Sequence, residues 1–370
     1  MKFIISKEDF IGGLSILVSV SSKKNLNIPI LQNVKLEANN GFLTLTTTDL
    51  DTTIKKTLQT NVEQNGITTV PAQTLFDIVK KMNDGSEILV EEKEDKSVVV
   101  SSGRTKFKLL SLDADTFPTV EDIDMCEECE INKDDLIDII DKTKFAISND
   151  EARYYLNGMY IHSKSSDDNN YIVGSATDGH RLAVVKKIQT DSKISGYIIP
   201  KKTLTEIRKI LDSCNEIITL SFSKTKIKLS TDGCVLVSKL IDAEYPDYER
   251  VIPASNSNIA IVKKKDFISS IDRVSTVVSD KHSGVKFVIS DNSIKLIAES
   301  AENGYADDEI NANYSGDIIE IGFNSRYLLD ILAQIESDEV YLKLGGGSLP
   351  IIVQGTEENN NLFVLMPVRI

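Results

Sequence analysis

The chain repeats one pattern three times along its 370 residues, and this internal repetition limits the folds that it can adopt. Residues 9–20, 135–145 and 266–278 each place apolar side chains on one helical face. The apolar residues that follow the opening aspartates are 126 and 131 residues apart (136 − 10 and 267 − 136). We therefore expect three copies of one structural unit.

A second helix recurs later in each copy. It is expected to start near Pro71, Pro200 and Asn324, since proline is favoured at a helix start. The leucines inside these helices are 129 and 124 residues apart (204 − 75 and 328 − 204). Each helix is followed by an acidic residue that opens a strand, at Glu87, Glu216 and Glu339.

Apolar and polar residues alternate between the helices, as in 43–45 and 294–296, which predicts half-buried strands. The fold class is therefore α+β, with two helices packed on antiparallel sheets in each repeat. We predict three domains at residues 1–124, 125–254 and 255–370. The joints are expected at Phe117-Pro118, leading into the acidic stretch that ends at Glu130, and at Tyr245-Pro246, leading into 253–258.

The composition, 41% hydrophobic and 26% charged residues, is typical of a globular protein. No apolar run approaches the ~20 residues that span a bilayer. The best candidate, 11–20, follows Glu8-Asp9 and so lacks the basic start of a signal peptide. We expect a cytoplasmic protein. The net charge of −14 leaves a nucleic-acid partner open, because local fields decide binding.

The four cysteines predict neither a disulfide framework nor a metal site. Cys126 and Cys129 form a C-x-x-C motif, but three glutamates surround them and raise the thiol pKa where redox chemistry needs it lowered. Cys214 and Cys234 are 20 residues apart, so they do not supply the second pair of a zinc ribbon. We expect no metal and no cofactor.

No residue pattern supports catalysis, and we expect no catalytic residues. His180 has no nucleophile or orienting acid beside it in sequence, and His162 and His282 are distant. The segment 345–348 lacks the Lys-Ser/Thr ending of a phosphate loop and is expected to be a turn. A repeat-built nuclease would need clustered carboxylates, whereas acidic residues here fall in linkers and turns such as 121–130. An interaction protein without chemistry is the other alternative, and its assembly state would distinguish it from a ring.

The copies differ most in the middle of the chain. The second copy reads Thr177-Asp178-Gly179-His180-Arg181-Leu182 where the first reads Thr48-Asp49-Leu50-Asp51-Thr52, 129 residues earlier (178 − 49). Asp-Gly is typical of a tight turn, so a plain hairpin tip is the simpler interpretation. The segment 153–158 has no counterpart in the other copies.

Six segments resemble the bacterial β sliding clamp family: 1–3, 29–31, 153–158, 177–182, 245–248 and 366–370. The resemblance covers the whole chain in order. It implies a non-catalytic processivity subunit of the DNA polymerase III holoenzyme that encircles double-stranded DNA without sequence preference. It also implies a head-to-tail homodimer whose six domains form a ring, with twelve helices lining the hole. The implied partners are the polymerase catalytic subunit, the clamp loader complex, and other polymerases and repair proteins.

The family also implies a groove for partner peptides. Carried over by motif, its walls are Leu156, Thr177, Gly179, His180, Arg181, Leu182, Pro246, Val251, Val364, Met366, Pro367, Val368 and Arg369. Apolar walls with few polar anchors and a flexible methionine suit a site with several partners. Val368 stands where the family often has Met, and the smaller side chain would alter which ligands fit.

The resemblance assigns two further surfaces. The strand 106–109, with Phe107 and Leu109, is expected to add to a strand near 286–288 of a second copy, with Val278 nearby. The expected DNA-contacting residues are Lys23, Lys24, Arg153, Tyr154, Tyr155, Lys201 and Lys202. Plain solvation of the lysines and core packing of the tyrosines remain the alternatives. Phosphate contacts would carry no sequence information, as a sliding ring requires.

Overall fold

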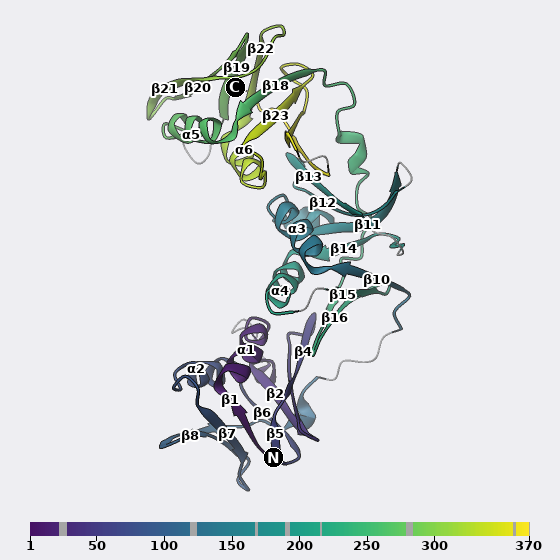
Figure 1. Ribbon diagram of the computed structural model, residues 1–370, viewed down its shortest axis with the longest axis vertical. Coiled ribbons are helices and arrows are strands. Elements are labelled where there is room, and N and C mark those ends of the chain that lie inside the picture. The colour runs from purple at the N-terminus through teal and green to yellow at the C-terminus, as the bar shows by residue number, and fades with distance from the viewer. Residues whose placement is uncertain are drawn as a thin grey trace. The chain divides into compact units, whose positions relative to one another are not determined.

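The computed structural model describes residues 1–21, 28–118, 124–166, 169–188, 193–214, 217–278, 284–357 and 360–369 (Figure 1). The chain forms two compact units. One consists of Met1–Leu136 with Lys202–Leu240, and the other of Ile137–Lys201 with Ile241–Ile370. The middle repeat therefore contributes to both units.

The first unit contains two sheets. The five-stranded sheet has the order β5-β1-β7-β8-β9. Its strands are β1 (Lys2–Ser6), β5 (Asn61–Gln64), β7 (Glu87–Glu92), β8 (Ser97–Ser102) and β9 (Thr105–Leu110). The eight-stranded sheet has the order β10-β15-β16-β17-β4-β3-β2-β6. Its strands are β2 (Asn33–Asn39), β3 (Phe42–Thr48), β4 (Thr52–Gln59), β6 (Gly66–Pro71), β10 (Glu127–Asn132), β15 (Ile217–Phe222), β16 (Lys226–Thr231) and β17 (Cys234–Lys239).

Helices α1 (Lys7–Leu17) and α2 (Ala72–Lys80) pack beside each other in this unit (Figure 1). The Ser6 side chain caps α1 by accepting a hydrogen bond from the Asp9 N–H. Phe10, Leu14 and Leu17 are fully buried, which is the spacing of a helix with one apolar face. Two short 3-10 helices, η1 (Pro29–Gln32) and η2 (Ala114–Thr116), complete the first repeat.

The second unit also has two sheets. The eight-stranded sheet has the order β14-β11-β12-β13-β25-β24-β23-β18. Its strands are β11 (Gly158–Ser166), β12 (Asn169–Thr177), β13 (Arg181–Ile188), β14 (Tyr197–Pro200), β18 (Asn258–Lys263), β23 (Glu339–Leu344), β24 (Ile351–Gly355) and β25 (Asn361–Leu365). The four-stranded sheet has the order β21-β20-β19-β22. Its strands are β19 (Gly284–Ser290), β20 (Ser293–Ser300), β21 (Gly304–Asn311) and β22 (Ile319–Asn324).

The remaining helices belong to the second and third repeats. Helix α3 (Lys133–Lys144) and helix α4 (Lys201–Leu211) each cross the division between the units. Helices α5 (Lys264–Ser275) and α6 (Ser325–Leu332) pack together in the second unit. The 3-10 helices η3 (Glu151–Leu156) and η4 (Tyr248–Val251) lie in the same unit.

The structure confirms the predicted α+β class, with two α-helices in each repeat and antiparallel pairing throughout the described strands. The first helix of every repeat ends earlier than predicted, at Leu17, Lys144 and Ser275. In the part of the chain that is described, no helix is long and apolar enough to cross a membrane.

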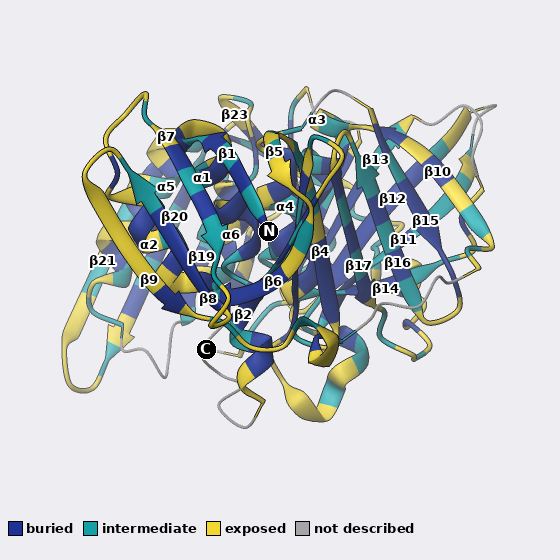
Figure 2. Cartoon of the chain, turned by 90° about the horizontal axis from the view of Figure 1, so that it is seen from below, coloured by how far each residue is buried: buried dark blue, intermediate teal, exposed yellow. Residues whose placement is uncertain are grey.

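Two sequence expectations are wrong. Residues 127–130 were expected in a linker, but they form β10, which pairs along its length with β15. Strand 286–288 was expected to accept a strand from a second copy. It lies in β19, which is already hydrogen-bonded on both sides by β20 and β22 and so has no free edge. An edge strand in this fold is more exposed than an internal one. Figure 2 shows this for the internal strand β8, which is largely buried, and the edge strand β9, which is mostly exposed.

Candidate functional site

The predicted Asp-Gly turn connects β12 and β13 and is held by its own side chains. The Thr177 hydroxyl accepts from the Gly179 N–H at 3.0 Å and donates to the Arg181 carbonyl at 2.6 Å. The Asp178 carboxylate accepts from the His180 N–H at 2.9 Å. Gly179 has φ +89°, and a Cβ there would lie 2.8 Å from Arg153 Nη1. Glycine suits this position because it adopts a positive φ without steric cost and leaves room for the Arg153 side chain.

Arg181 is buried behind this turn with its guanidinium group fully engaged. Its side chain is 9% exposed and pairs with Asp178 at 3.0 Å and Asp330 at 2.5 Å. Nη2 also donates to the Phe145 carbonyl at 2.8 Å, and the guanidinium carbon lies 4.3 Å from the centre of the Tyr327 ring. The side chain joins the hairpin of the second repeat to α6 of the third. It thereby braces the hairpin beside which the groove is predicted.

The C-terminal tail runs beside the same turn. The Met366 N–H donates to the His180 carbonyl at 2.9 Å, directly after the pairing of Leu182 with Val364 in β13 and β25. Met366 is 38% exposed. A flexible thioether therefore lies at the surface next to the hairpin tip.

A buried apolar cluster includes residues of β13 and β25, the two strands next to the tail. It brings together three predicted groove residues, Leu156, Leu182 and Val364, with the buried rings of Tyr245 and Tyr248. Two other predicted residues lie at the surface beside these rings: Pro246 is exposed between them, and Val251 is 48% exposed at the end of η4.

The segment 245–251 is anchored by residues that the sequence analysis did not assign to the site. The rings of Tyr160 and Tyr245 stack 4.9 Å apart with an interplanar angle of 5°. His162 Nδ1 lies 3.1 Å from the Ser163 carbonyl, and Nε2 lies 2.9 Å from the Tyr248 hydroxyl. Because a carbonyl only accepts, Nδ1 carries the proton and the Tyr248 hydroxyl donates to Nε2. Burial lowers the pKa of His162, which favours this neutral form. Tyr160 and His162 are two residues apart on one strand face. This spacing was the signal in the sequence that could have identified them as residues of the site.

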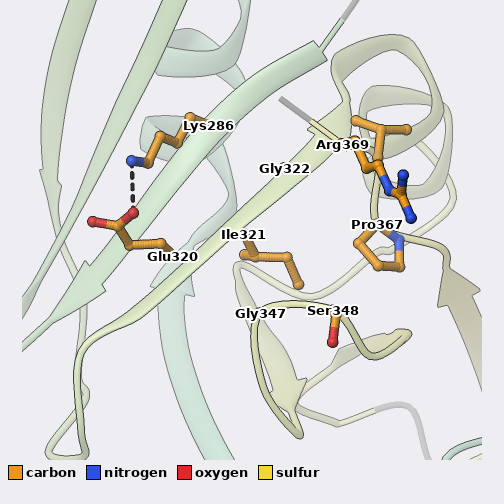
Figure 3. A pocket seen from close by; sticks show the side chains of 9 residues that line it. Lys286, Glu320, Ile321, Gly322, Gly347, Ser348, Pro367 and Arg369 are labelled. Carbon is orange, nitrogen blue, oxygen red and sulfur yellow. Dashed lines mark ion pairs between the residues drawn. The ribbon is translucent and has the colours of Figure 1, made fainter.

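The last predicted groove residues, Pro367, Val368 and Arg369, line a hollow of about 600 Å³. Its other walls are Lys286, Glu320, Ile321, Gly322, Gly347 and Ser348. Figure 3 shows Lys286 and Glu320 on one side of it and Arg369 and Pro367 on the opposite side. As predicted, 345–348 is a turn, and it closes this hollow from below in the view.

The residues expected to contact DNA have different surroundings. Tyr154 is 55% exposed in η3, whereas Tyr155 is half-buried against the apolar cluster, as core packing would require. Arg153 pairs with Asp150 at 2.9 Å and lowers the pKa of that carboxyl group. Lys23 and Lys24 lie outside the described residues.

The lysine pair at the start of α4 is engaged by neighbouring side chains. Lys201 donates to the Asn149 side chain at 2.9 Å, and burial lowers its pKa. Lys202 forms an ion pair with Asp49. Both lysines therefore hold protein partners in the absence of DNA.

The residues expected at a contact between copies lie on or near an open edge. Strand β9 is the last strand of its sheet, and Phe107, which is 36% exposed, lies on the same face as the buried Leu109. Val278 is half-buried just beyond α5.

Metal-binding clusters are absent from the described parts of the chain. These parts contain no cluster of three or more His, Cys, Asp or Glu side chains that could hold a metal ion. The cysteines at 126, 129, 214 and 234 are all free thiols. Burial raises the pKa of Cys234 to about 11, which makes that thiol unreactive.

Three α+β repeats, each with two helices on antiparallel sheets, define the class of this protein as a clamp-type fold. The comparisons identify the particular family. The N-terminal, central and C-terminal domains of the DNA polymerase III beta subunit match residues 1–121, 130–247 and 249–369. The chain belongs to this family, and it is a processivity clamp of DNA polymerase III without chemistry of its own.

Individual relatives match over the full length. The beta sliding clamp of Caulobacter vibrioides is 35% identical over 373 residues and covers 100% of both chains. A sliding clamp structure from Bartonella birtlesii bound to griselimycin has a TM-score of 0.96 at 38% identity, again covering 100% of both chains. A Caulobacter crescentus clamp, with polyethylene glycol bound to a putative beta-motif tethering region, has a TM-score of 0.95 at 35% identity and covers 100% of this chain and 99% of that one.

Proposed function

We propose that two copies of this chain close head to tail around duplex DNA and tether replication proteins to it through peptides that bind the groove. In this account residues 1–124, 125–254 and 255–370 act as the three domains of each copy. The observation that carries the proposal is the meeting of the C-terminal tail with the hairpin tip. The exposed Met366 donates its N–H to the His180 carbonyl, and Leu182 and Val364 of the two adjoining strands belong to one apolar cluster. A bacterial replication clamp works on the chromosome, so we expect it in the cytoplasm.

The proposed occupants of the groove are short segments of the polymerase catalytic subunit, the clamp loader, other polymerases and repair proteins. Its proposed walls combine apolar side chains with a few polar ones, and the hairpin tip is held in fixed geometry by its own hydrogen bonds, which suits several related peptides. Two clamp relatives carry molecules, griselimycin in one and polyethylene glycol at a putative tethering region in the other.

Fluorescence anisotropy tests the groove directly. A labelled peptide from the C-terminal tail of a polymerase III catalytic subunit should bind, and griselimycin should displace it. Deletion of residues 366–370 should abolish binding because it removes one wall. If the truncated protein binds the peptide with undiminished affinity, the groove assignment is wrong.

For the contact between copies we propose that β9 pairs with β21 of the second copy, in place of the internal strand β19. Both are end strands of their sheets, and open edges favour strand addition. Lys106 and Lys108 make β9 basic, whereas residues 307–309 make β21 acidic. Pairing across the two edges would require Lys108, Asp307 and Asp308 to exchange their present partners, which are Asp95, Lys295 and Arg273. Leu110 is 81% exposed and Tyr305 57% exposed, so each edge offers apolar area to a partner.

Light scattering tests this contact. Phe107→Asp should shift the protein toward a monomer because it places a charge in a dry joint. Phe42→Asp, at a phenylalanine that is 51% exposed on β3, is the matched control and should leave the dimer intact. An unchanged dimer in Phe107→Asp would place the interface elsewhere.

For DNA we propose sequence-independent contacts to phosphates by Lys23, Lys24, Arg153, Tyr154, Tyr155, Lys201 and Lys202. Lys201 and Lys202 would exchange their present partners, Asn149 and Asp49, for phosphate oxygens. Such contacts are individually weak and salt-sensitive. Substitution of Lys202 by Glu should therefore weaken binding to short linear duplexes, and equal binding of the variant would remove this residue from the DNA surface.

A further inference from the structure

We propose that the hollow beside the C-terminal tail binds an acidic side chain next to the groove-binding segment of a partner peptide. This inference rests on the proposed peptide groove and extends it by a site that selects for charge. The hollow lies between the edge strand β22, the turn after β23 and tail residues 367–369 (Figure 3).

Glycines keep this hollow open. Gly322 on β22 and Gly347 in the turn contribute only backbone to the lining. A Cβ on Gly347 would lie 2.4 Å from the Glu320 carbonyl oxygen, so the turn packs against β22 as closely as it does only because this side chain is missing. The volume of about 600 Å³ lies within the range of roughly 300–1,000 Å³ that is typical of ligand sites.

The charges around the hollow favour an anion. Lys286 and Glu320 neutralise each other through an ion pair of 2.6 Å. Arg369 is exposed and has no carboxylate partner among the residues that are described. The three side chains sum to one positive charge, and the Ser348 hydroxyl adds a possible hydrogen-bond donor. A carboxylate fits this environment better than an amide or an ammonium group.

The tail makes the groove and the hollow continuous. The Met366 N–H donates to the His180 carbonyl of the hairpin, and two residues later the Val368 N–H donates to the Gly322 carbonyl of β22, each at 2.9 Å. A peptide that lies along the tail therefore extends from the apolar cluster to the hollow. Its residues beyond the apolar anchor would reach Arg369 and Lys286.

Peptides with a single varied residue test the proposal on the full-length protein. The polymerase tail peptide is extended at either end by Glu, Gln or Lys, and each form is measured by fluorescence anisotropy at low and high salt. When the extension is at the end of the peptide that reaches the hollow, the Glu form should bind about three- to ten-fold more tightly than the Gln form, as expected for one partly exposed charge pair. About 0.5 M salt should remove most of the difference.

Two variants change the charge of the hollow without touching the groove walls. Glu320→Gln leaves Lys286 unpaired and should increase the preference for Glu. Lys286→Gln leaves Glu320 unpaired and should abolish or reverse it. The unextended peptide should bind both variants as it binds the unmodified protein, which also controls for folding.

The outcomes separate this proposal from the groove itself. If the unextended peptide binds and the Glu, Gln and Lys extensions bind equally at both ends, the acidic site is wrong and the groove stands. If the unextended peptide does not bind at all, the groove is wrong and the acidic site is wrong with it. A preference for Glu that neither variant changes would also overturn the proposal, because the charge would then be recognised elsewhere.

Discussion

The hairpin between β3 and β4 and the hairpin between β12 and β13 have the same pattern of hydrogen bonds at their tips. They differ in the side chains that surround the tips. In the first, the Leu50 N–H donates to the Thr48 hydroxyl at 3.1 Å and the Asp51 N–H to Asp49 at 3.1 Å. The corresponding bonds in the second, to Thr177 and Asp178, are 3.0 and 2.9 Å. Each hairpin also accepts one backbone bond of 2.9 Å from the end of a neighbouring strand, from Lys239 in one case and Met366 in the other.

The surrounding side chains differ between the two hairpins. We call the first hairpin closed because polar side chains cover it, and the second open because apolar side chains take their place. The first is covered by polar contacts: Lys239 pairs with Asp51 at 2.8 Å, and the hydroxyls of Thr52 and Ser238 lie 2.9 Å apart. At the matching positions of the second, Met366 replaces Lys239 and Leu365 replaces Ser238. One repeat scaffold therefore carries a hairpin covered by polar side chains in one copy and a hairpin beside apolar side chains in the other, and a few substitutions distinguish them.

Backbone strain distinguishes the hairpins further. Leu50 adopts φ +76° at the position where the second hairpin has Gly179, and its side chain is 52% exposed. A non-glycine residue in the left-handed region costs about 1 kcal/mol.

The largest effect should come from the brace of the second hairpin. Arg181→Ala leaves Asp178 and Asp330 without their buried partner and should lower the free energy of unfolding by about 3 kcal/mol. It should also weaken peptide binding by more than about ten-fold, since the hairpin loses its tie to α6. Arg273→Ala, which removes an ion pair whose arginine is 61% exposed, is the control and should cost less than about 1 kcal/mol. Equal losses in chemical denaturation would show that Arg181 is no special brace.

The next effect should come from giving the open hairpin the side chain of the closed one. Met366→Lys should reduce peptide affinity about ten-fold, because it places a charge on an apolar wall. The melting temperature should change little, since Met366 is partly exposed. Lys239→Met is the reciprocal change and should create no peptide site. Undiminished binding by Met366→Lys would mean that this wall does not contact the ligand.

Exchanging the tip residues should have smaller and opposite effects on stability. Leu50→Gly should stabilise the protein by up to about 1 kcal/mol by removing left-handed strain. Gly179→Leu should destabilise it, because strain is added and the new side chain meets Arg153. Urea denaturation gives the free energy of unfolding of both variants. If Leu50→Gly destabilises the protein, the leucine side chain makes contacts that stabilise it by more than the strain costs.

The smallest effect should come from His162, which has no counterpart in the first hairpin. Burial lowers its pKa in the folded protein, so the folded state binds fewer protons than the unfolded chain. Its contribution is thus present above the ordinary histidine pKa of about 6.5 and is lost as the pH falls below it. His162→Gln should flatten this part of the decline in melting temperature between about pH 7 and 5. An identical decline in both proteins would remove His162 as its source.

The sequence predicted the local features of the second hairpin and not its long-range ties. Apolar periodicity located the helices, and the Asp-Gly pair indicated the tip at Gly179. The ion pair of Arg181 with Asp330 joins residues 149 positions apart, and nothing in either local sequence specifies it. The same reason explains why the positions of β10 and β19 in their sheets were not predicted correctly. Whether a strand lies inside a sheet or at its edge depends on partners that the strand itself does not encode.

Retention on circular DNA tests the central claim most directly. The protein is loaded onto nicked circular DNA by a clamp loader, washed at a salt concentration that eliminates binding to short linear duplexes, and the DNA is then cut once. A closed ring is a topological link that salt cannot screen, so the protein should stay on the circle and leave after the cut. Equal salt sensitivity on circular and linear DNA would contradict encirclement and, with it, the account of this chain as a clamp that holds DNA by its shape.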